Sequence, residues 1–441
     1  MKHLHVVTNS ELTTFRTCRA RHGFEYIDLL RPLVQALPLT WGSLYHHGAD
    51  AGWMAAWLVP GASPAARLAA ACAAAPVAIG EKAAEYIAVL EGTTFPEGVD
   101  VAALCQETEE AAKVASWSVV HYLQQAQADL VMVPLLVEGK YQIAVPNEGG
   151  RPGMLKAAGQ IDLLLWDRQG GRVVVQDHKG IGTNVSDVER RVVLDTQLVG
   201  YVSAATELLR GARTNPVGFL ERLATTQAAR NVVAANLEEL LRATVGSIAY
   251  NVVRRAMPRD PNINLLKKSQ CVTGVHAELM RVQETTGEPQ GEVSVAEIDT
   301  LWSRYQAALE RQIVERELPA TEKQLAKLEA LKARGDTYFR QIEHFKDGDA
   351  IRRWQRELWV ESRRMRASER DVRERTRNPQ ACTQPSSPVC PFSVVCLAPA
   401  DPLARKHYRV AKVKHEELEH DGISHRDRER EEKVQQEEVG F

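Results

Sequence analysis

Residues 158–179 read AGQIDLLLWDRQGGRVVVQDHK, and this stretch decides the fold of the chain. Two apolar runs, residues 157–166 and 171–177, have the composition of neighbouring β-strands. The polar segment Asp167-Arg-Gln-Gly-Gly between them predicts a hairpin loop. Each strand also carries a carboxylate, and a carboxylate is costly in an apolar strand unless it binds something.

The carboxylates of the two predicted strands are Asp162 and Asp177. If the strands pair, both side chains converge near one end of the sheet, and Lys179 lies on the face of Asp177 because strand side chains repeat every two residues. Carboxylate oxygens suit Mg²⁺ or Mn²⁺, which would lower the pKa of a bound water and neutralise charge on a phosphate. The Lys179 ammonium could stabilise a charged transition state. The alternative is a surface hairpin with solvated side chains.

Four further residues agree with a metal-assisted site, and each has a plainer alternative. Gln197 and Tyr201 share a helix face at i, i+4, although packing is the commoner reason for such a pair. His46 follows Gly42 near the start of a predicted helix and could complete a metal shell, although a single histidine is usually no ligand. Glu138 either adds a carboxylate or marks where its strand meets solvent.

Composition excludes several classes of protein. The 441 residues can bury a large core and hold more than one module. The 55 basic and 57 acidic residues nearly cancel, so a nucleic-acid surface would have to be local. No apolar run is long enough to span a bilayer, and the N-terminus lacks the apolar core of a signal peptide, so we expect a cytoplasmic protein without membrane contact.

The pattern along the chain predicts an α/β protein with helical additions at both ends. Helices are expected over residues 10–30, 50–92 and 101–127, strands at 131–145, near Phe219 and at 245–255, and a charged helical segment from about 294 to 377. Ser186-Asp-Val-Glu189 and Ser294-Val-Ala-Glu297 are capping-box patterns that would open helices. The expected regions are 1–130, 131–290, 291–400 and 401–441, the last a charged tail that we expect to be frayed.

Taken together, these residues resemble a PD-(D/E)XK nuclease, with a central mixed sheet flanked by helices. More narrowly, they resemble the RecB-like branch that includes the AddB nuclease domain, the CRISPR-associated adaptation nucleases and phage exonucleases. The motifs that carry the resemblance appear in the expected order across residues 10–210: Gly42-x-x-x-His46, Glu138, Gly159-Gln-Ile-Asp162, Gln176-Asp177-His178-Lys179 and Gln197-x-x-x-Tyr201.

The resemblance implies a role for each residue. His46, Asp162 and Asp177 would ligate the metal, with the backbone carbonyl of His178. Lys179 would be the catalytic lysine, and Gln197 and Tyr201 would support the site and contact DNA. Because no core position is missing, we expect an active enzyme.

Seven cysteines make an odd count, which argues against a disulfide framework. Cys382, Cys390 and Cys396 cluster late in the chain, and Cys18 is the candidate fourth thiolate. In the iron–sulfur members of the branch, one cysteine comes from the first helix and three come from the C-terminal end. The gap from Cys382 to Cys390 is longer than is usual there. Four thiolates suit a [4Fe–4S] cluster, and zinc is the alternative.

These features predict a Mg²⁺- or Mn²⁺-dependent exonuclease that acts on DNA ends or single strands in recombination, repair or phage DNA processing. Arginines at 352–366 with Trp354 and Trp359 suit contacts to a single strand, although a solvated helix face is the alternative. No phosphate-binding ATP loop is present, so a helicase or single-strand annealing protein would be a separate chain. The rival prediction is a non-catalytic iron–sulfur or zinc subunit that binds DNA ends in a helicase–nuclease complex.

Overall fold

The computed structural model describes residues 5–34, 36–147, 152–182, 185–188, 195–258, 300–316, 319–382 and 390–418. Contacts divide the chain into two compact units. One consists of Met1–Gly180, Glu189–Asn251 and Gln341–Phe441, and the other of Ile181–Val188 and Val252–Arg340. Cys271 and the capping-box pattern at 294–297 lie outside the described residues, and the division into four regions stays a prediction.

A six-stranded mixed sheet forms the centre of the fold, in the order β1-β4-β5-β6-β7, and β3 also pairs with β4. β1 runs parallel to β4, whereas β3 and β5 pair with β4 in the antiparallel direction. The strands of this sheet are β1 (His5–Thr8), β3 (Val133–Pro146), β4 (Pro152–Asp167), β5 (Arg172–Ile181), β6 (Thr244–Arg254) and β7 (Phe339–Phe345).

The hairpin of β4 and β5 is the one that the sequence predicts. Leu163, Leu164 and Leu165 pair with Gln176, Val175 and Val174, and all six side chains are buried. Asp167 fixes the loop, because its carboxylate accepts hydrogen bonds from the Gly170 N–H at 2.8 Å and the Arg172 guanidinium at 3.1 Å. The α/β class with a central mixed sheet is thereby confirmed.

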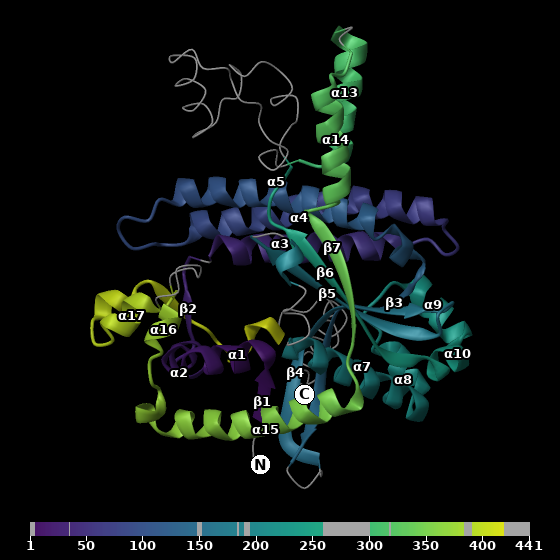
Figure 1. Ribbon diagram of the computed structural model, residues 1–441. Helices are drawn as coiled ribbons and strands as arrows, with labels where there is room; N and C mark the ends of the chain where they lie inside the picture. The colour runs from purple at the N-terminus through teal and green to yellow at the C-terminus, as the bar shows by residue number, and fades with distance from the viewer. Residues whose placement is uncertain are drawn as a thin grey trace, which may run out of the picture. The chain divides into compact units, whose positions relative to one another are not determined.

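Three long helices, α3 (Leu37–Ala56), α4 (Pro64–Gly92) and α5 (Val101–Gln125), pack together on one side of the sheet (Figure 1). Small residues allow the close approach of their axes: a side chain on Gly48 would meet Ile79 of α4 at 2.4 Å. Ser63 and Asp100 cap the first turns of α4 and α5 through their side-chain oxygens. Among the described residues, no helix has the length and apolar character needed to cross a bilayer.

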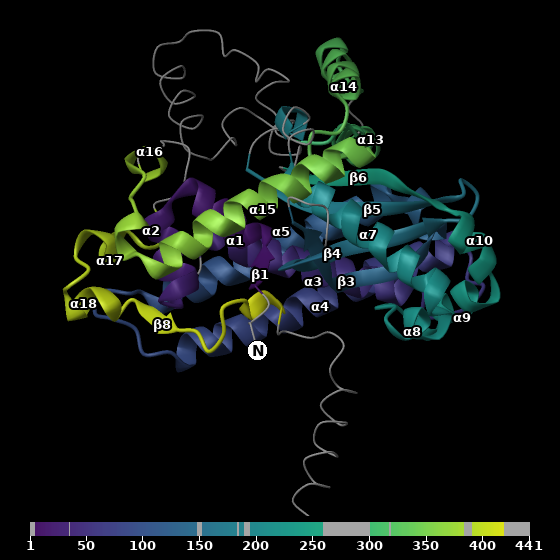
Figure 2. The same cartoon turned by 90° about the horizontal axis from the view of Figure 1, so that it is seen from below.

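The opposite side of the sheet is covered by α1 (Asn9–Thr17), α7 (Thr196–Thr214) and α15 (Gly348–Arg370), and α15 crosses both of the others (Figure 2). The N-cap of α7 lies nine residues after Ser186, the N-cap that the sequence pattern suggests. Its N-cap is Asp195, whose carboxylate accepts the Gln197 N–H at 2.8 Å, and Val185–Val188 forms only a short 3-10 turn (η3). Local capping patterns do not distinguish these two starts.

Two other expectations about secondary structure are wrong. Phe219 lies in the helix α8 (Pro216–Glu221), where its side chain is fully buried. The segment expected to be helical from 294 to 377 is interrupted by the strand β7, whose residues alternate only weakly between exposed and half-buried positions. An edge strand of this kind carries little hydrophobic periodicity, so the charged composition favoured a helix.

The remaining helical segments are short, apart from the pair α13 and α14 in the second unit. They are α2 (Arg19–His22), a π-helical turn η1 (Gly23–Ile27), η2 (Gln127–Val131), α9 (Gln227–Ala235), α10 (Leu237–Arg242), α13 (Trp302–Arg316), α14 (Glu322–Arg334), η6 (Val372–Glu374), α16 (Pro379–Cys382), α17 (Ser393–Leu397), α18 (Pro402–Arg405) and η7 (Glu416–Leu418).

Residues 405–418 were expected to form a frayed tail, but they pack against the N-terminal region. The strand β8 (Tyr408–Val410) pairs antiparallel with β2 (Leu30–Pro32). Lys414 Nζ lies 2.6 Å from a carboxylate oxygen of Glu11, which is fully buried in α1. A buried glutamate needs such partners, and Lys414 and His415 supply them from a segment more than four hundred residues away.

Candidate active site

The candidate site begins where β4 and β5 separate. The last regular pair of the two strands is Leu163 with Gln176. Beyond it, the Asp162 carboxylate accepts the backbone N–H of His178 at 2.8 Å, so a side chain takes the place of a strand carbonyl. This exchange leaves Asp162 and Asp177 buried next to the end of the regular hairpin.

Three candidate ligands from three elements meet at this point. His46 comes from α3, Glu138 from β3 and Asp162 from β4, and one ligand atom of each lies within 4.8 Å of the others. His46 Nδ1 is 3.3 Å from Glu138 Oε1 and 3.6 Å from Asp162 Oδ2. Asp177 and the cysteines are not members of this group, which is the one such group among the described residues.

Glu138 reaches the site through an unusual backbone conformation. Its φ angle is +50°, in the left-handed region that side chains other than glycine rarely adopt. The next residue, Gly139, pairs again with Ile161 of β4, and the Glu138 carboxylate accepts a hydrogen bond from Gln160. A side-chain-bearing residue in this conformation costs about 1–3 kcal/mol of stability, and the conformation persists only where the surrounding structure holds it in place.

The charges of the group act strongly on one another. Burial would lower the pKa of His46, but the carboxylates of Asp162 and Glu138 outweigh it and raise that pKa to about 9. Burial also raises the pKa of Glu138, with a smaller opposing effect from His46. Asp50, one turn after His46 on α3, is a further carboxylate of the site that was not predicted. Burial and the charges of Glu138 and Asp162 raise its pKa well above the usual range. The i, i+4 spacing of His46 and Asp50 was the available signal.

Asp177 and Lys179 form the second half of the site. Asp177 is fully buried, one oxygen lies 3.1 Å from Lys179 Nζ, and Oδ2 has no hydrogen-bond partner among the described residues. Burial raises the pKa of Asp177 to about 7, against the opposing effect of Lys179. Burial disfavours the ammonium of Lys179, but Asp177, Asp162 and Asp195 outweigh it and raise the pKa of this lysine.

A chain of hydrogen bonds connects Lys179 to the start of α7. Lys179 Nζ donates to Gln197 Oε1 at 2.9 Å, and Gln197 Nε2 donates to the hydroxyl of Tyr201. The N-cap Asp195 accepts the Gln197 N–H and, at 3.3 Å, the hydroxyl of Tyr250 in β6. The expected pair Gln197 and Tyr201 is therefore at the site, whereas Asp195 and Tyr250 were missed, because nothing local in the sequence relates them to Lys179.

The imidazole of His178 points into the core. It lies among the rings of Tyr45, His46 and Tyr122, at centroid distances of 5.9, 5.9 and 4.9 Å, and 3.3 Å from the side-chain amide of Asn251. Burial lowers the pKa of His178 to about 3, so the ring is neutral. A role for His178 as a ligand would fall to its backbone carbonyl.

A buried network of polar side chains lies beneath Asp177 and His178. Gln176 donates to Asp129 at 2.7 Å and accepts from Asn251 at 3.0 Å. Gln341 of β7 donates to Asp129 at 2.8 Å and to Asn251 at 3.0 Å. The amide groups thereby tie β5, β6 and β7 together directly beside Asp177, and a fully satisfied network of this kind makes its surroundings rigid.

The residues present fit a divalent cation. One imidazole nitrogen and several carboxylate oxygens are donors that Mn²⁺ accepts, and Mg²⁺ prefers the oxygens. The buried Asp177 Oδ2 without a partner is the kind of atom that a metal would satisfy. Close carboxylates that are buried together need such compensation.

The four predicted cysteine ligands come from the two ends of the chain. Cys18 is buried, Cys390 and Cys396 are half-buried, and Cys382 is exposed. Burial raises the pKa of Cys390 and of Cys396, and the charges of Cys18 and Cys382 raise both further. No three of these sulfurs belong to a group within 4.8 Å among the described residues.

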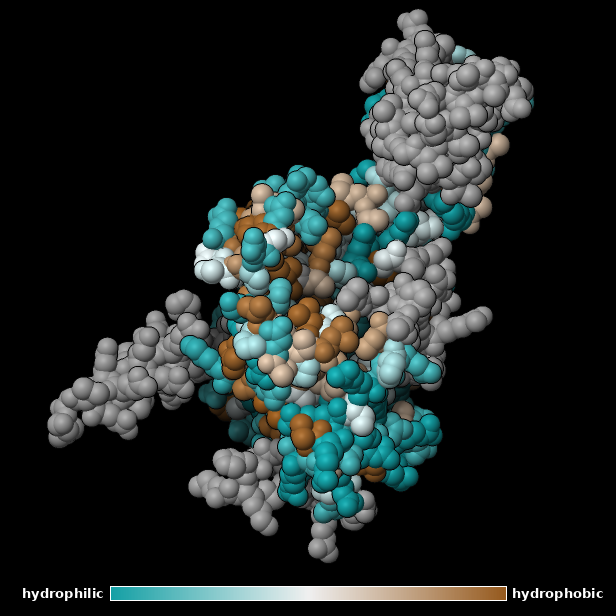
Figure 3. Space-filling model, turned by 90° about the vertical axis from the view of Figure 1, so that its left-hand side faces the viewer, coloured by the Kyte–Doolittle hydropathy of each residue, from teal (hydrophilic) through white to brown (hydrophobic). Residues whose placement is uncertain are grey.

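Backbone carbonyl and N–H groups also connect the two ends of the chain. Next to Cys18, the Ala20 N–H donates to the Thr376 carbonyl at 3.1 Å, and Asn378 donates to the Thr17 carbonyl at 2.8 Å. Between Cys390 and Cys396, Phe392 stacks on Phe24 and Tyr408. Figure 3 faces the side on which α17 lies in Figure 1, and hydrophobic side chains gather there in patches between hydrophilic ones.

Comparison with known proteins assigns the family. No curated protein matches the chain. The sequence model of the PD-(D/E)XK nuclease superfamily matches residues 6–397, which cover both halves of the candidate site and most of the chain. The proteins of this superfamily are metal-dependent nucleases, in agreement with the fold and with the group around His46. The chain belongs to the PD-(D/E)XK nuclease superfamily.

Proposed function

We propose that the protein is a Mg²⁺- or Mn²⁺-dependent deoxyribonuclease that degrades DNA from ends or single strands, in recombination, repair or phage DNA processing. The observation that carries the proposal is the meeting of His46, Glu138 and Asp162 beside the buried pair of Asp177 and Lys179. A solvated hairpin, the alternative from sequence, would not bury Asp162 and Asp177.

The chain's own residues have distinct roles in this proposal. His46, Glu138, Asp162 and Asp177 would hold the cation, which when bound supplies positive charge beside the scissile phosphate and makes water more acidic. Lys179 remains protonated between Asp177 and Gln197, so its ammonium can stabilise the negative charge that develops on the phosphate. Gln197 and Tyr201 hold this ammonium in place.

The finer assignment, to the iron–sulfur group of the RecB-like branch, is also part of the proposal. It rests on the four cysteines Cys18, Cys382, Cys390 and Cys396. Four thiolates suit a [4Fe–4S] cluster or zinc. We favour the cluster, because one early cysteine and three late ones resemble the arrangement in the iron–sulfur members of the branch.

The test of the nuclease is hydrolysis of end-labelled single- and double-stranded DNA in Mn²⁺. The variants Asp177→Asn and Lys179→Ala should lose at least 100-fold in rate while still binding DNA, in line with the loss of a principal electrostatic group. Asp167→Asn is the matched control, because this acid also lies on the hairpin but faces the loop. It should retain the wild-type rate.

Two outcomes decide between the proposal and its rival. Rates that fall only in the two site variants support the nuclease. Equal and negligible product from all proteins, with DNA binding intact, supports the non-catalytic DNA-end-binding subunit, which would act beside a separate helicase. For the cluster, anaerobically purified protein should contain about four iron atoms per chain, and Cys18→Ser should lose them. Zinc in place of iron would overturn the cluster assignment.

A further inference from the structure

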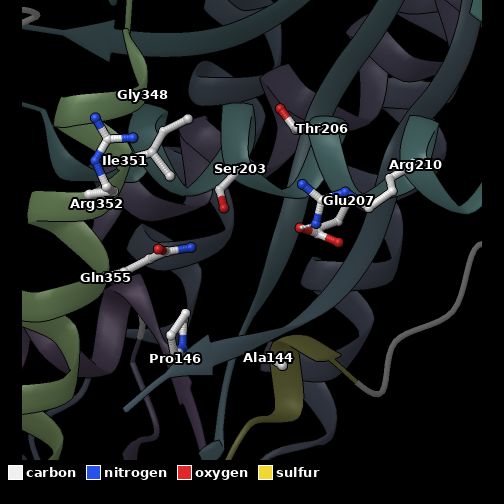
Figure 4. A pocket seen from close by; sticks show the side chains of 10 residues that line it. All are labelled: Ala144, Pro146, Ser203, Thr206, Glu207, Arg210, Gly348, Ile351, Arg352 and Gln355. Atoms are coloured by element: carbon white, nitrogen blue, oxygen red, sulfur yellow. Dashed lines mark hydrogen bonds and ion pairs between the residues drawn. The ribbon is translucent and has the colours of Figure 1, made fainter. Parts of the chain in front are cut away.

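A groove beside α7 is lined by both polar and apolar residues and includes no member of the metal-ligating group. It has a volume of about 480 Å³ and is bounded by α7, the first turns of α15 and the end of β3 (Figure 4). Arg210, Ser203 and Thr206 enter it from α7, and Arg352 and Gln355 from α15. None of these residues belongs to the proposed catalytic machinery.

The polar part of the lining suits contacts to a nucleic-acid backbone, and the rest of it is formed by Ala144, Pro146, Gly348 and Ile351. Guanidinium, hydroxyl and amide groups are those that proteins present to phosphate and sugar. Glu207 is the one acid among the groove-lining residues, against two arginines. Figure 4 shows Arg352 and Arg210 on either side of Ser203.

Both arginines are available to a phosphate. Arg210 pairs with Glu207 at 2.5 Å, and Arg352 pairs with Asp349. Each pair is formed within one helix, and the two arginine side chains are 66% and 69% exposed. Exposed ion pairs of this kind contribute little to stability, so a phosphate can replace the carboxylate as the partner of each arginine.

α7 connects this groove to the site. Ser203 is six residues after Gln197 and Arg210 is thirteen after it, which places them about 9 and 20 Å further along the helix axis. The groove therefore covers about 10 Å of α7, a length that suits about two neighbouring phosphates of an extended strand. Trp354 fixes the partner helix, because its ring lies only 3.1 Å from where a side chain on Gly200 would begin.

We infer that the groove between α7 and α15 binds the sugar–phosphate backbone of a single DNA strand whose scissile phosphate lies at the site. The inference rests on the proposed function, since it names where that substrate continues. Arg210 and Arg352 contact phosphates, and Ser203, Thr206 and Gln355 donate hydrogen bonds to the backbone. Such contacts are independent of base sequence and depend on salt.

The experiment measures the anisotropy of a labelled single-stranded oligonucleotide in EDTA, so that no cleavage occurs. Arg210→Ala, Arg352→Ala and the double variant are compared with Arg242→Ala, an exposed arginine that pairs with Glu238 one turn earlier outside the groove. The double variant should bind at least tenfold more weakly. Its slope of log K against log salt should be smaller by about 1.4, that is, 0.7 for each lost phosphate contact. Arg352→Lys should recover most of the affinity.

The results separate this inference from the proposed function. If the double variant keeps the wild-type affinity and salt dependence, the inference about the groove is wrong, even where the wild type cleaves DNA in Mn²⁺. A loss confined to duplex DNA also overturns it, because the occupant is a single strand. Failure of the wild type to cleave overturns the nuclease, whatever the groove variants do to binding. Melting temperatures equal to wild type verify that the exposed substitutions leave the fold intact.

Discussion

The Asp162 carboxylate accepts the backbone N–H of His178 at 2.8 Å, at the point where β4 and β5 cease to pair. One side chain therefore closes the sheet and faces His46 at 3.6 Å. The hydrogen bond from His178 to Asp162 therefore accounts both for the separation of β4 and β5 and for the position of a candidate metal ligand.

Asp162 should consequently separate stability from metal binding. Asp162→Ala leaves the buried His178 N–H without an acceptor and should lower the free energy of unfolding by about 1–3 kcal/mol. Asp162→Asn keeps an acceptor and should cost less. Urea denaturation measures the free energy of unfolding of both variants. Calorimetric titration measures Mn²⁺ binding, and both variants should lose affinity for the ion. Equal stability of Ala and Asn variants would contradict the structural role.

Substitution of Glu138 should weaken Mn²⁺ binding without lowering the stability of the fold. Its φ of +50° costs a glutamate energy that glycine does not incur. Glu138→Gly should keep or raise the free energy of unfolding, by up to about 1 kcal/mol, while Mn²⁺ binding weakens. Gln142→Gly, in the same strand but with ordinary backbone geometry, should only destabilise. If Glu138→Gly destabilises as much as this control, the conformation carries no strain.

Much of this site can be predicted from local sequence, because hairpin and motif residues are close along the chain. The strands 157–166 and 171–177, the turn at Asp167 and the i, i+4 pair of Gln197 and Tyr201 depend on periodicity alone. Asp50 shares a helix face with His46, but Asp195 and Tyr250 could not be predicted in this way. They reach the site only through tertiary packing of α7 and β6, which no local pattern records.

The same limit applies at the C-terminal end. Residues 405–418 are charged and lack hydrophobic periodicity, so they read as a tail, yet β8 pairs with β2. The partners that hold this segment, Glu11 and Arg31, are far away in sequence. The strand β7 was missed for a related reason, since its role in the sheet depends on pairing with β6 rather than on its own composition.

Asp195 should matter for the rate rather than for binding. Asparagine caps helices as well as aspartate does, so Asp195→Asn should retain α7. It removes a charge that acts on Lys179 and weakens the contact with Tyr250. We expect kcat to fall about tenfold, equivalent to about 1.4 kcal/mol, with KM unchanged. Asp100→Asn, at the N-cap of α5, is the control. A change in KM alone would show that Asp195 acts on substrate binding instead.

The buried Glu11 should make stability depend on pH. Burial would raise its pKa, but His22, His415 and Lys414 outweigh this and hold it below the usual range. A depressed pKa means that the ionised carboxylate stabilises the fold above about pH 4.5, the ordinary value for glutamate, and that this contribution is lost as the pH falls further. Glu11→Gln should lower the free energy of unfolding by about 3 kcal/mol at pH 7 and flatten its decrease at acid pH.

Denaturation curves between pH 3 and pH 7 measure this effect. Glu374→Gln is the control, because this exposed glutamate pairs with Arg19 at the surface. It should follow the wild-type curve. Parallel curves for wild type and Glu11→Gln would show that the C-terminal segment is held by other contacts.

The central claim is that His46, Glu138, Asp162 and Asp177 hold one catalytic cation. Anomalous diffraction from crystals soaked in Mn²⁺ tests it most directly, since it locates the ion independently of activity. The account predicts a peak within about 2.0–2.5 Å of ligand atoms from His46 and Asp162, and its disappearance in Asp162→Asn. A peak elsewhere, or none at saturating Mn²⁺, would contradict the account.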